Sequence, residues 1–509
     1  MRTTGLAALL LAVALGHGRP ACADVVVYPR IPGRPLSTTF EMTVDGRAVP
    51  VHRYGTVSFA WFAFSGTADV KVTVKEAVTS YVLSPQRNAV PSSVAGRDVA
   101  FRLTQPRKLV LHKVNRLSDE LFVFADALET DPPKPGAPGV FDVRRYGASP
   151  GGGDSTRAIQ RAIDAAAASP TGGVAYVPPG VYDVTASLVL KSRVHLYLAA
   201  GAVVRVRPGT YVSRVVFPIS RVEQARISGR GVIDGRAIDG EQSYEFLMHT
   251  NQADKLQIED IMFLDGKTTA LRIAASTNSR VSNVKVLSGS PNLSDGIDLD
   301  GDHKITLANS FVYSSDDSVA ITSGTNSFSY GIGAPTENIR ITGNVFHHPS
   351  SGYCCYGHIV SVVPWRGTTH IRNITFDDND VIRAGGVFSI YPFGGTNVEA
   401  VTYRNSRIEE TTEKPFEFLA VDCTSWGPQN CGQPVRVLGY VRNVRVDNVT
   451  FGNLSPQPSM LRGYSASADV RGVYFNNLRI GGTLVMDARG ARLDIVGPYV
   501  TEVVFASSH

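Results

Sequence analysis

Short segments of alternating apolar and polar residues fill the first part of the chain. Between Val25 and Leu128 they include TFEMTVDG, VSFAWFAFSG, DVKVTVKE and DVAFRLTQ, and Gly, Asp and Pro separate them. Alternation with a period of two is typical of strands that bury one face. Residues 24–130 are therefore predicted to form an antiparallel β-sandwich.

A run of proline and glycine then interrupts this pattern. DPPKPGAPG, residues 131–139, holds four prolines and two glycines, and such a composition gives a stiff connector without regular structure. We place the domain boundary there, with a second domain over residues 140–509.

One segment after the connector has the periodicity of a helix. In DSTRAIQRAIDAAAA, Asp154 or Ser155 can cap the first turn, and Ile159 and Ile163 lie on the same face. No other segment gives a comparable helical pattern.

The rest of the chain is a weak internal repeat in which pairs of short β-branched segments flank a polar turn. Examples are RVSNVKV, HKITLANSFV, ENIRITGNVF and NVRVDNVTF. The repeated asparagines are 26, 35, 35, 26, 43 and 29 residues apart: Asn283, Asn309, Asn344, Asn379, Asn405, Asn448 and Asn477. Such periods indicate a solenoid, and this composition favours a right-handed parallel β-helix, so the fold class is all-β. The predicted helix near residue 160 would cap its first coil.

Charge and hydropathy exclude several classes of function. The formal net charge is +5 in 509 residues, and the basic residues are scattered, which argues against a nucleic-acid partner. Residues 1–23 resemble a secretory signal, with Arg2, an apolar run from Leu6 to Leu15, and a small-residue site at Ala21 to Ala23. No other apolar run is long enough to span a membrane. We expect a secreted monomer without a membrane partner.

Four cysteines remain after the signal segment: Cys354, Cys355, Cys423 and Cys431. An even number in an exported protein favours disulfides over a metal site. Cys423 with Cys431 is the easier pair, but the sequence leaves the pairing open.

Three aspartates stand out in SDGIDLDGDHKITLANSFVYSSDDSVAITSG. Asp295 precedes Asp316 by 21 residues, close to one coil of the repeat, and Asp317 follows directly. In a solenoid, residues one coil apart lie above one another, so Asp295 and Asp316 are expected at corresponding positions. A bend at SSDDS would bring Asp317 to the same groove.

Paired carboxylates of this kind suit the cleavage of a glycosidic bond. One protonates the leaving oxygen while another activates water, and their mutual repulsion raises the pKa of the acid. The alternative is that these aspartates only shape turns. Asp298, Asp300 and Asp302 are interpreted as a solvated strand edge, with a calcium site as the alternative.

At these motifs the sequence resembles the polygalacturonase-like glycoside hydrolases of family 28. The matching motifs are Ser294 to Asp298, Asp316 to Ile321, and Gly357 to Ser361. The resemblance implies a right-handed parallel β-helix, with Asp316 as the general acid and with Asp295 and Asp317 holding the attacking water. Two carboxylates that converge on one point suit a held water better than a covalent ester, so we expect inversion, and we expect no cofactor and no metal.

The family's R-I-K motif, which grips a galacturonate carboxylate, is absent, and GGVFSIYPFGG stands in its place. The chain also resembles family 49, whose dextranases join a β-sandwich to the β-helix and cleave neutral α-glucans. We therefore expect a hydrolase of a neutral polysaccharide such as dextran. The alternatives are a polygalacturonase and a non-catalytic carbohydrate-binding solenoid.

Substrate-binding residues are expected near the third motif. Aromatic rings give sugars a flat apolar surface, and we select Trp365 and Tyr391 for this role, with Phe393 as either groove or core. Arg366 and Arg383 are expected to bond sugar hydroxyls, with ordinary surface cations as the alternative. His358 is expected in the groove as a substrate-binding residue, with a buried, hydrogen-bonded histidine as the alternative.

Overall fold

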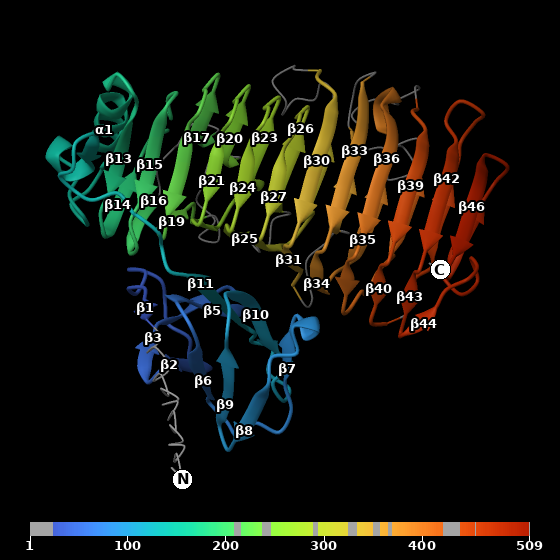
Figure 1. Cartoon of the computed structure of the whole chain (residues 1–509), viewed down its shortest axis with the longest axis horizontal. Coiled ribbons are helices and arrows are strands. Elements are labelled where there is room, and N and C mark those ends of the chain that lie inside the picture. The colour runs from blue at the N-terminus through green and yellow to red at the C-terminus, as the bar shows by residue number, and fades with distance from the viewer. Residues whose placement is uncertain are drawn as a thin grey trace, which may run out of the picture.

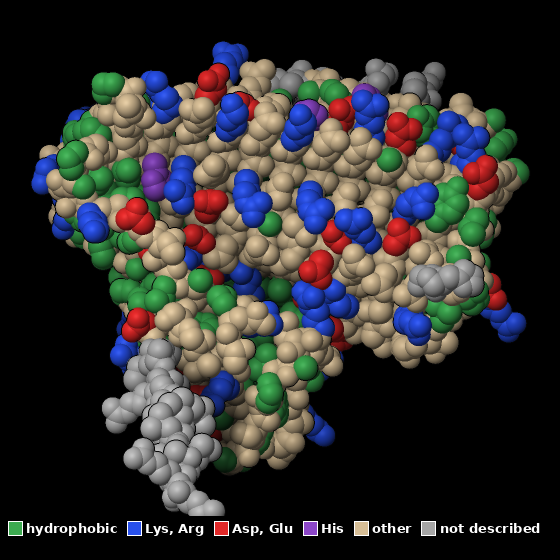
Figure 2. Space-filling view, in the orientation of Figure 1, with side chains coloured by type: hydrophobic (Ala, Val, Ile, Leu, Met, Phe, Trp, Pro, Cys, Tyr) green, Lys and Arg blue, Asp and Glu red, His purple; other side chains and the backbone are tan. Residues whose placement is uncertain are grey.

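The computed structural model describes residues 24–207, 215–236, 246–288, 294–323, 333–349, 357–364, 369–420, 438–453 and 455–507. The predicted signal segment and the four cysteines lie outside these residues. Within the described residues, no helix has the length and apolar character needed to cross a bilayer. Figure 2 shows Lys and Arg side chains spread among acidic ones on the visible face, without a gathered basic patch.

The first domain consists of two sheets whose strands are mostly antiparallel. One holds β1 (Val25–Val27), β4 (Val51–Tyr54), β5 (Val57–Phe64), β7 (Val82–Ser84), β10 (Arg107–His112) and β11 (Leu121–Ala127). The other holds β2 (Phe40–Val44), β3 (Arg47–Val49), β6 (Ala68–Val74), β8 (Ser92–Ala95) and β9 (Asp98–Leu103). A shared apolar core lies between them, as the alternating pattern predicts. The 3-10 turn η1 (Gln86–Asn88) follows β7.

The second domain is a parallel β-helix of three long sheets (Figure 1). The sheet that carries the three aspartates, here called the site sheet, holds β17 (Val215–Ser220), β20 (Phe246–Asn251), β23 (Thr269–Ala274), β26 (Asp295–Asp300), β29 (Val319–Thr322), β32 (His358–Val362), β35 (Gly386–Ile390), β38 (Phe416–Leu419), β41 (Ser459–Arg462) and β45 (Leu493–Val496).

The second sheet of the β-helix, here called the docking sheet, faces the sandwich. It holds β14 (Gly180–Val184), β16 (Ala202–Val206), β19 (Val232–Asp234), β22 (Met262–Leu264), β25 (Lys285–Ser288), β28 (Phe311–Ser314), β31 (Val345–His347), β34 (Asp380–Arg383), β37 (Arg407–Ile408), β40 (Thr450–Phe451), β43 (Arg479–Ile480) and β44 (Thr483–Leu484).

The third sheet is the longest. It holds β12 (Val140–Asp142), β13 (Gly173–Val177), β15 (Val194–Leu198), β18 (Arg226–Gly229), β21 (Gln257–Glu259), β24 (Arg280–Ser282), β27 (Thr306–Ala308), β30 (Thr336–Thr342), β33 (His370–Asp377), β36 (Asn397–Arg404), β39 (Val441–Asp447), β42 (Val470–Asn476) and β46 (Val500–Ala506).

Stacked apolar side chains hold the coils together. On the site sheet, Ile297, Val319, Val360, Phe388 and Phe416 lie in register on successive coils, and all are fully buried. Because each coil covers the apolar face of its neighbour, the weak repeat needs an apolar residue at each stacked position but not the same residue type. The predicted all-β class, with a sandwich before a parallel β-helix, is confirmed.

The repeated asparagines occupy two positions rather than one. Five of them adopt positive φ at turns: Asn283, Asn309, Asn405, Asn448 and Asn477. Asparagine tolerates this left-handed conformation better than most residues. On the two remaining coils, Gly343 and Asp378 take the positive-φ position. Asn344 and Asn379 follow them and are buried, with Asn344 Nδ2 donating to Asn379 Oδ1 at 2.9 Å.

The predicted helix is α1 (Thr156–Ala168), which packs on β12 and β13 at the first coil (Figure 1). Asp154 supports its first turn, because Asp154 Oδ1 accepts a 2.9 Å hydrogen bond from the Thr156 N–H. Ile159 and Ile163 are buried, as their spacing predicts. The 3-10 turn η2 (Val143–Tyr146) precedes α1.

The sandwich packs against the docking sheet through a continuous apolar interface. Aromatic residues of β5 and β11, among them Phe59, Phe122 and Phe124, contact a cluster of docking-sheet residues that includes Phe311 and Tyr313. The connector 131–139 thus joins two domains that share an apolar interface, and β11 ends four residues before it, at Ala127. Such an apolar interface disfavours independent domain motion.

Candidate active site

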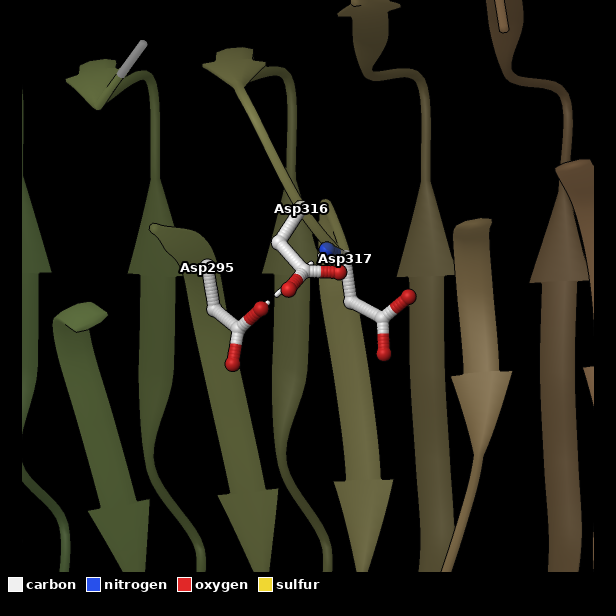
Figure 3. A group of neighbouring side chains, drawn as sticks. All are labelled: Asp295, Asp316 and Asp317. Atoms are coloured by element: carbon white, nitrogen blue, oxygen red, sulfur yellow. Dashed lines mark hydrogen bonds between the residues drawn. The ribbon is translucent and has the colours of Figure 1, made fainter. Parts of the chain in front are cut away.

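Three carboxylates converge on the site sheet. Asp295, Asp316 and Asp317 each offer one oxygen, and these three oxygens all lie within 4.8 Å of one another. Figure 3 shows the carboxyl groups of Asp295 and Asp316 directed toward each other, with that of Asp317 beside them on the side of the later coils. The prediction that the three acids share one patch of surface is therefore met by the geometry.

The local backbone explains this convergence. Asp295 begins β26, while Asp316 and Asp317 lie in the bend between β28 and β29. Ile297 pairs with Val319, an offset of 22 residues, so Asp317 rather than Asp316 stands opposite Asp295. The expected register was thus one residue short. The bend lets both neighbours reach the groove, since a straight strand would direct them to opposite faces.

Backbone contacts fix the bend between its neighbouring coils. The Asp317 N–H donates to Asp295 Oδ1 at 3.1 Å, and the Ser318 N–H donates to the His358 carbonyl at 2.8 Å. Gly357 lies directly over this bend, where a Cβ atom would come within 2.6 Å of the Asp316 carbonyl carbon. Only glycine allows this close approach.

The pKa values of two of the acids are raised. Burial is the largest cause for Asp316, and the neighbouring Asp317 adds to it, while His358 acts in the opposite direction; the pKa of Asp316 rises to about 7. Burial and the charges of Asp298, Asp316 and Asp317 also raise the pKa of Asp295 well above its ordinary value. The cluster therefore retains protons at neutral pH, and Asp316 suits the role of an acid.

His358 lies beside Asp317 and is nearly inaccessible. Its backbone N–H donates to Asp317 Oδ1 at 2.8 Å, its Nδ1 lies 3.5 Å from the same oxygen, and its Nε2 lies 3.2 Å from Glu417 Oε2. Burial lowers the pKa of His358, but the hydrogen bonds to Asp317 and Glu417 outweigh burial and raise it to about 9. Both ring nitrogens thus face carboxylates rather than the open groove expected for a sugar contact.

Asp298, Asp300 and Asp302 are not the solvated strand edge that the sequence suggested. All three are buried. Arg272 donates to Asp298 at 3.3 Å and to Asp300 at 2.5 Å, and Asp302 accepts from the Ser276 N–H at 2.7 Å. Each of these carboxylates thus accepts a hydrogen bond from a protein donor, which does not favour the calcium alternative. Burial is the largest cause that raises the pKa values of all three.

The prediction that Arg383 binds substrate is wrong. Arg383 lies on β34 of the docking sheet and is buried against the sandwich, where its guanidinium pairs with Glu120. Glu120 Oε2 also lies 2.6 Å from His347 Nε2. Because β34 belongs to the docking sheet and not to the site sheet, Arg383 faces the sandwich. The sequence of one strand does not reveal this partner.

Tyr391 is also not an exposed platform. It is buried, its hydroxyl donates to Glu417 Oε2 at 2.9 Å, and its ring is 6.0 Å from that of His358 in an edge-on arrangement. Phe393 stacks on Tyr391 at 5.7 Å and belongs to the same buried cluster, so the core alternative holds for it. Trp365 and Arg366 lie outside the described residues.

Sequence reasoning missed Glu417 and Lys414. Glu417 lies on β38, and Lys414 Nζ donates to its Oε1 at 2.6 Å. The available signal was FEFL, in which one acid interrupts an apolar strand two coils after His358. An acid at such a position needs a partner, and here the partners are His358, Tyr391 and Lys414.

Among the described residues, the three aspartates are also the one group whose ligand atoms converge closely enough to be considered for a metal. Oxygens of Asp295 and Asp317 already accept backbone N–H groups, and the His358 ring stands beside Asp317. A hard cation such as calcium wants six to eight oxygens. We therefore interpret the cluster as a site that shares protons.

Comparisons with known proteins agree with this chemistry. Residues 180–487 match glycosyl hydrolases family 28. Polygalacturonase QRT2 of Arabidopsis thaliana is 27% identical over 253 residues, 44% of this chain and 52% of that protein. A probable endopolygalacturonase D of Neosartorya fischeri is 26% identical over 162 residues, 31% of this chain and 28% of that protein. The chain thus spans about half or less of the length of these relatives.

Solved structures share the fold. The family 28 exopolygalacturonase of Yersinia enterocolitica superposes with a TM-score of 0.56 and 15% identity over 87% of this chain and 94% of that one. Dex49A from Penicillium minioluteum gives a TM-score of 0.56 and 14% identity over 94% and 96% of the two chains. At these identities the likeness concerns the fold alone. Because the family match covers more than half of the sequence and includes the three aspartates, the chain belongs to glycosyl hydrolases family 28.

Proposed function

We propose that this protein hydrolyses glycosidic bonds of a pectic polysaccharide by an inverting mechanism. The observation that carries the proposal is the convergence of Asp295, Asp316 and Asp317, with a raised pKa at Asp316. Family membership and the polygalacturonases among its relatives support the substrate class. They favour pectin as the substrate, in place of the dextran that we expected from the sequence.

In the proposed reaction, Asp316 is the general acid. It transfers its proton to the oxygen that links the two sugars as the bond from that oxygen to the anomeric carbon breaks. A water held by Asp295 and Asp317 attacks the anomeric carbon from the opposite face and gives its proton to Asp317. Asp316 ends ionised and Asp317 protonated, so one proton returns through solvent.

The spacing of the acids suits a held water. Two oxygens that each lie about 2.8 Å from a shared water are separated by roughly 4.6 Å. The oxygens of the cluster lie within 4.8 Å of one another. Inverting enzymes have carboxyl groups about 6.5–9.5 Å apart, against about 5–5.5 Å in retaining ones. The oxygens of this cluster lie closer together than the inverting range, so the inverting assignment rests on the third acid, which leaves two carboxylates to hold the water, and not on the spacing.

A neutral α-glucan is the second candidate. On the site sheet, Ala320, Ser361, Ser389 and Glu417 lie in register on successive coils. None of these positions carries a cation, whereas a sugar carboxylate is best recognised by Arg or Lys. Two further observations fit this candidate: the N-terminal β-sandwich and the fold likeness to Dex49A.

Release of reducing ends separates the candidates. The purified chain is incubated with polygalacturonate, dextran and pullulan, and the Asp316→Asn variant serves as the control for the chemistry. The proposal expects release from polygalacturonate alone. Release from dextran or pullulan alone would replace the proposed substrate with a neutral glucan, and release from none by a folded protein would contradict hydrolysis of these polymers.

A further inference from the structure

Glu417 occupies a central place in the site that the catalytic aspartates do not explain. It lies on β38, flanked by the core residues Phe416 and Phe418, so its side chain points out of the core toward the outer face of the site sheet. Only 6% of Glu417 is exposed. A buried carboxylate at this position would be costly without partners.

Glu417 has three donors around its two oxygens. Oε2 lies 3.2 Å from His358 Nε2 and accepts from the Tyr391 hydroxyl at 2.9 Å. Oε1 accepts from Lys414 Nζ at 2.6 Å. Each of these three contacts brings a charged or strongly polar group to Glu417, which is the arrangement that holds a carboxylate in one orientation.

The His358 ring is correspondingly held on both sides. Nδ1 faces Asp317 and Nε2 faces Glu417. A neutral imidazole has one donor and one acceptor nitrogen, so one of the two carboxylates would face a lone pair, whereas an imidazolium donates from both nitrogens. The geometry therefore selects the protonated ring.

The space for this ring depends on Gly386 at the start of β35. A Cβ atom at residue 386 would overlap the ring carbons of His358. The ring can thus lie over Gly386, between Asp317 and Glu417, which are three coils apart from each other. The fold reserves this position for His358.

We propose that Glu417 is a positioning residue that holds His358 as an imidazolium against Asp317, and thereby orients Asp317 toward the attacking water. Lys414, whose side chain is 27% exposed, contacts the second oxygen of Glu417 and offsets part of its charge. The inference rests on the proposed hydrolysis, because Asp317 is assigned a role there.

The charged and titratable groups that face His358 come from four places in the fold: the bend before β29, the segment after β31, the end of β35, and β38 with the residues before it. They are Asp316, Asp317, His348, Tyr391, Lys414 and Glu417. Burial and neighbouring positive groups lower the pKa of His348 to about 3, so it adds no positive charge near neutral pH. Asp317 and Glu417 are thus the groups that favour the charged ring.

The test is an NMR titration of His358 in protein with 13C-labelled histidine rings, assigned with the His358→Gln variant. In Glu417→Gln we expect the His358 pKa to fall by about one unit or more, because a carboxylate partner is lost. The kcat of this variant should also fall, because Asp317 is then held less firmly toward the attacking water. Glu417→Asp, which retains the charge, should keep the pKa above that of Glu417→Gln. Glu399→Gln removes a carboxylate from β36 on another sheet and should change neither quantity.

An unchanged His358 pKa in folded Glu417→Gln would overturn the inference. If that variant does not fold, Lys414→Met provides the second test: removing the cation leaves Glu417 uncompensated, and the His358 pKa should rise, so an unchanged or lower value would overturn it. The titration needs no substrate. A shifted pKa in a chain that hydrolyses no polysaccharide would therefore reject the proposed function and the role of Asp317 while leaving the contact itself intact.

Discussion

The Asp317 backbone N–H donates to Asp295 Oδ1 across one coil of the β-helix, at 3.1 Å. This hydrogen bond holds the Asp295 side chain against the main chain of Asp317. The register of β26 and β29 therefore sets the spacing of the acids, together with the side chain rotamers. The two residues lie close together because the segment between them has the length of one coil. A one-residue change in the loop between these strands would separate them.

Asp316→Asn should abolish turnover without unfolding the protein, because the amide keeps the shape of the side chain but delivers no proton. Loss of a general acid costs about 10²–10⁴-fold in rate. We expect a kcat lower by this factor, measured as reducing-end release, and an unchanged far-UV circular dichroism spectrum. Wild-type turnover in the folded variant would remove Asp316 from the acid role.

The rate should fall as pH rises through about 7. The pKa of Asp316 is raised to about 7, chiefly by burial and by Asp317. An acid must be protonated to act, so activity is present below this pH and lost above it. The profile of kcat/KM between acidic pH and pH 9 reports this limb. A rate that increases through neutral pH would contradict the assignment.

Gly386→Ala should reduce kcat while leaving the chain folded, because the added Cβ displaces the His358 ring. We expect a loss of about 10-fold or more, as is common when a positioning contact is lost. Gly490→Ala is the matched control, since a Cβ there meets its neighbours at ordinary contact distances of 3.4 Å and beyond. Equal activity of the two variants would argue against a fixed place for the His358 ring.

Asp126→Asn should destabilise the contact between the sandwich and the β-helix. Asp126 is buried in that interface and pairs with Lys285, and Trp61 Nε1 donates to it at 2.7 Å. Removing one partner of a buried ion pair typically costs about 3–5 kcal/mol. Unfolding in urea should show this loss, whereas Asp69→Asn, which breaks an exposed pair with Arg102, should leave the midpoint unchanged.

Lys285 should also make the free energy of unfolding depend on pH. Burial lowers the pKa of Lys285 to about 7, against the raising effect of Asp126. Because the pKa of Lys285 is lower in the folded than in the unfolded chain, folding releases a proton between these two pKa values. The contribution of this lysine to stability therefore increases as the pH rises from about 7 toward the ordinary pKa of lysine. We expect the urea midpoint to increase more from pH 7 to pH 9 in the wild type than in Lys285→Met. An equal change in the two proteins would contradict this prediction.

Much of the fold was predictable from the sequence because the pattern repeats. Period-two alternation before residue 128 and the Asn-centred repeat after it were enough to predict the two architectures. The register of the repeat was less accessible, since Gly343 and Asp378 take the turn position on the coils where Asn344 and Asn379 are buried instead. Single-residue shifts of this kind change which side chain is interior without altering the local pattern.

The site was predicted where chemistry and sequence proximity coincide, and was missed where it depends on contacts across coils. Asp295, Asp316 and Asp317 lie within one coil of one another. Arg383 looked available because its partner, Glu120, is 263 residues away in another domain. The roles of the aspartates, the signal segment and export stay predictions.

Buried partners explain the remaining errors. The alternating acids after Asp295 read as a solvated edge because nothing in the local sequence shows that Arg272, one coil earlier, pairs with two of them. Glu417 was overlooked for the same reason. Both show that a charge within an apolar strand of a β-helix should be matched with charges on the adjacent coils.

The stereochemistry of the first product tests the central claim most directly. Hydrolysis of an α-linked galacturonan is followed by proton NMR from the first seconds, before mutarotation mixes the anomers. Attack by a water held between Asp295 and Asp317, opposite to the acid Asp316, predicts that the β-anomer forms first. Initial release of the α-anomer would show a retained configuration and would contradict the account.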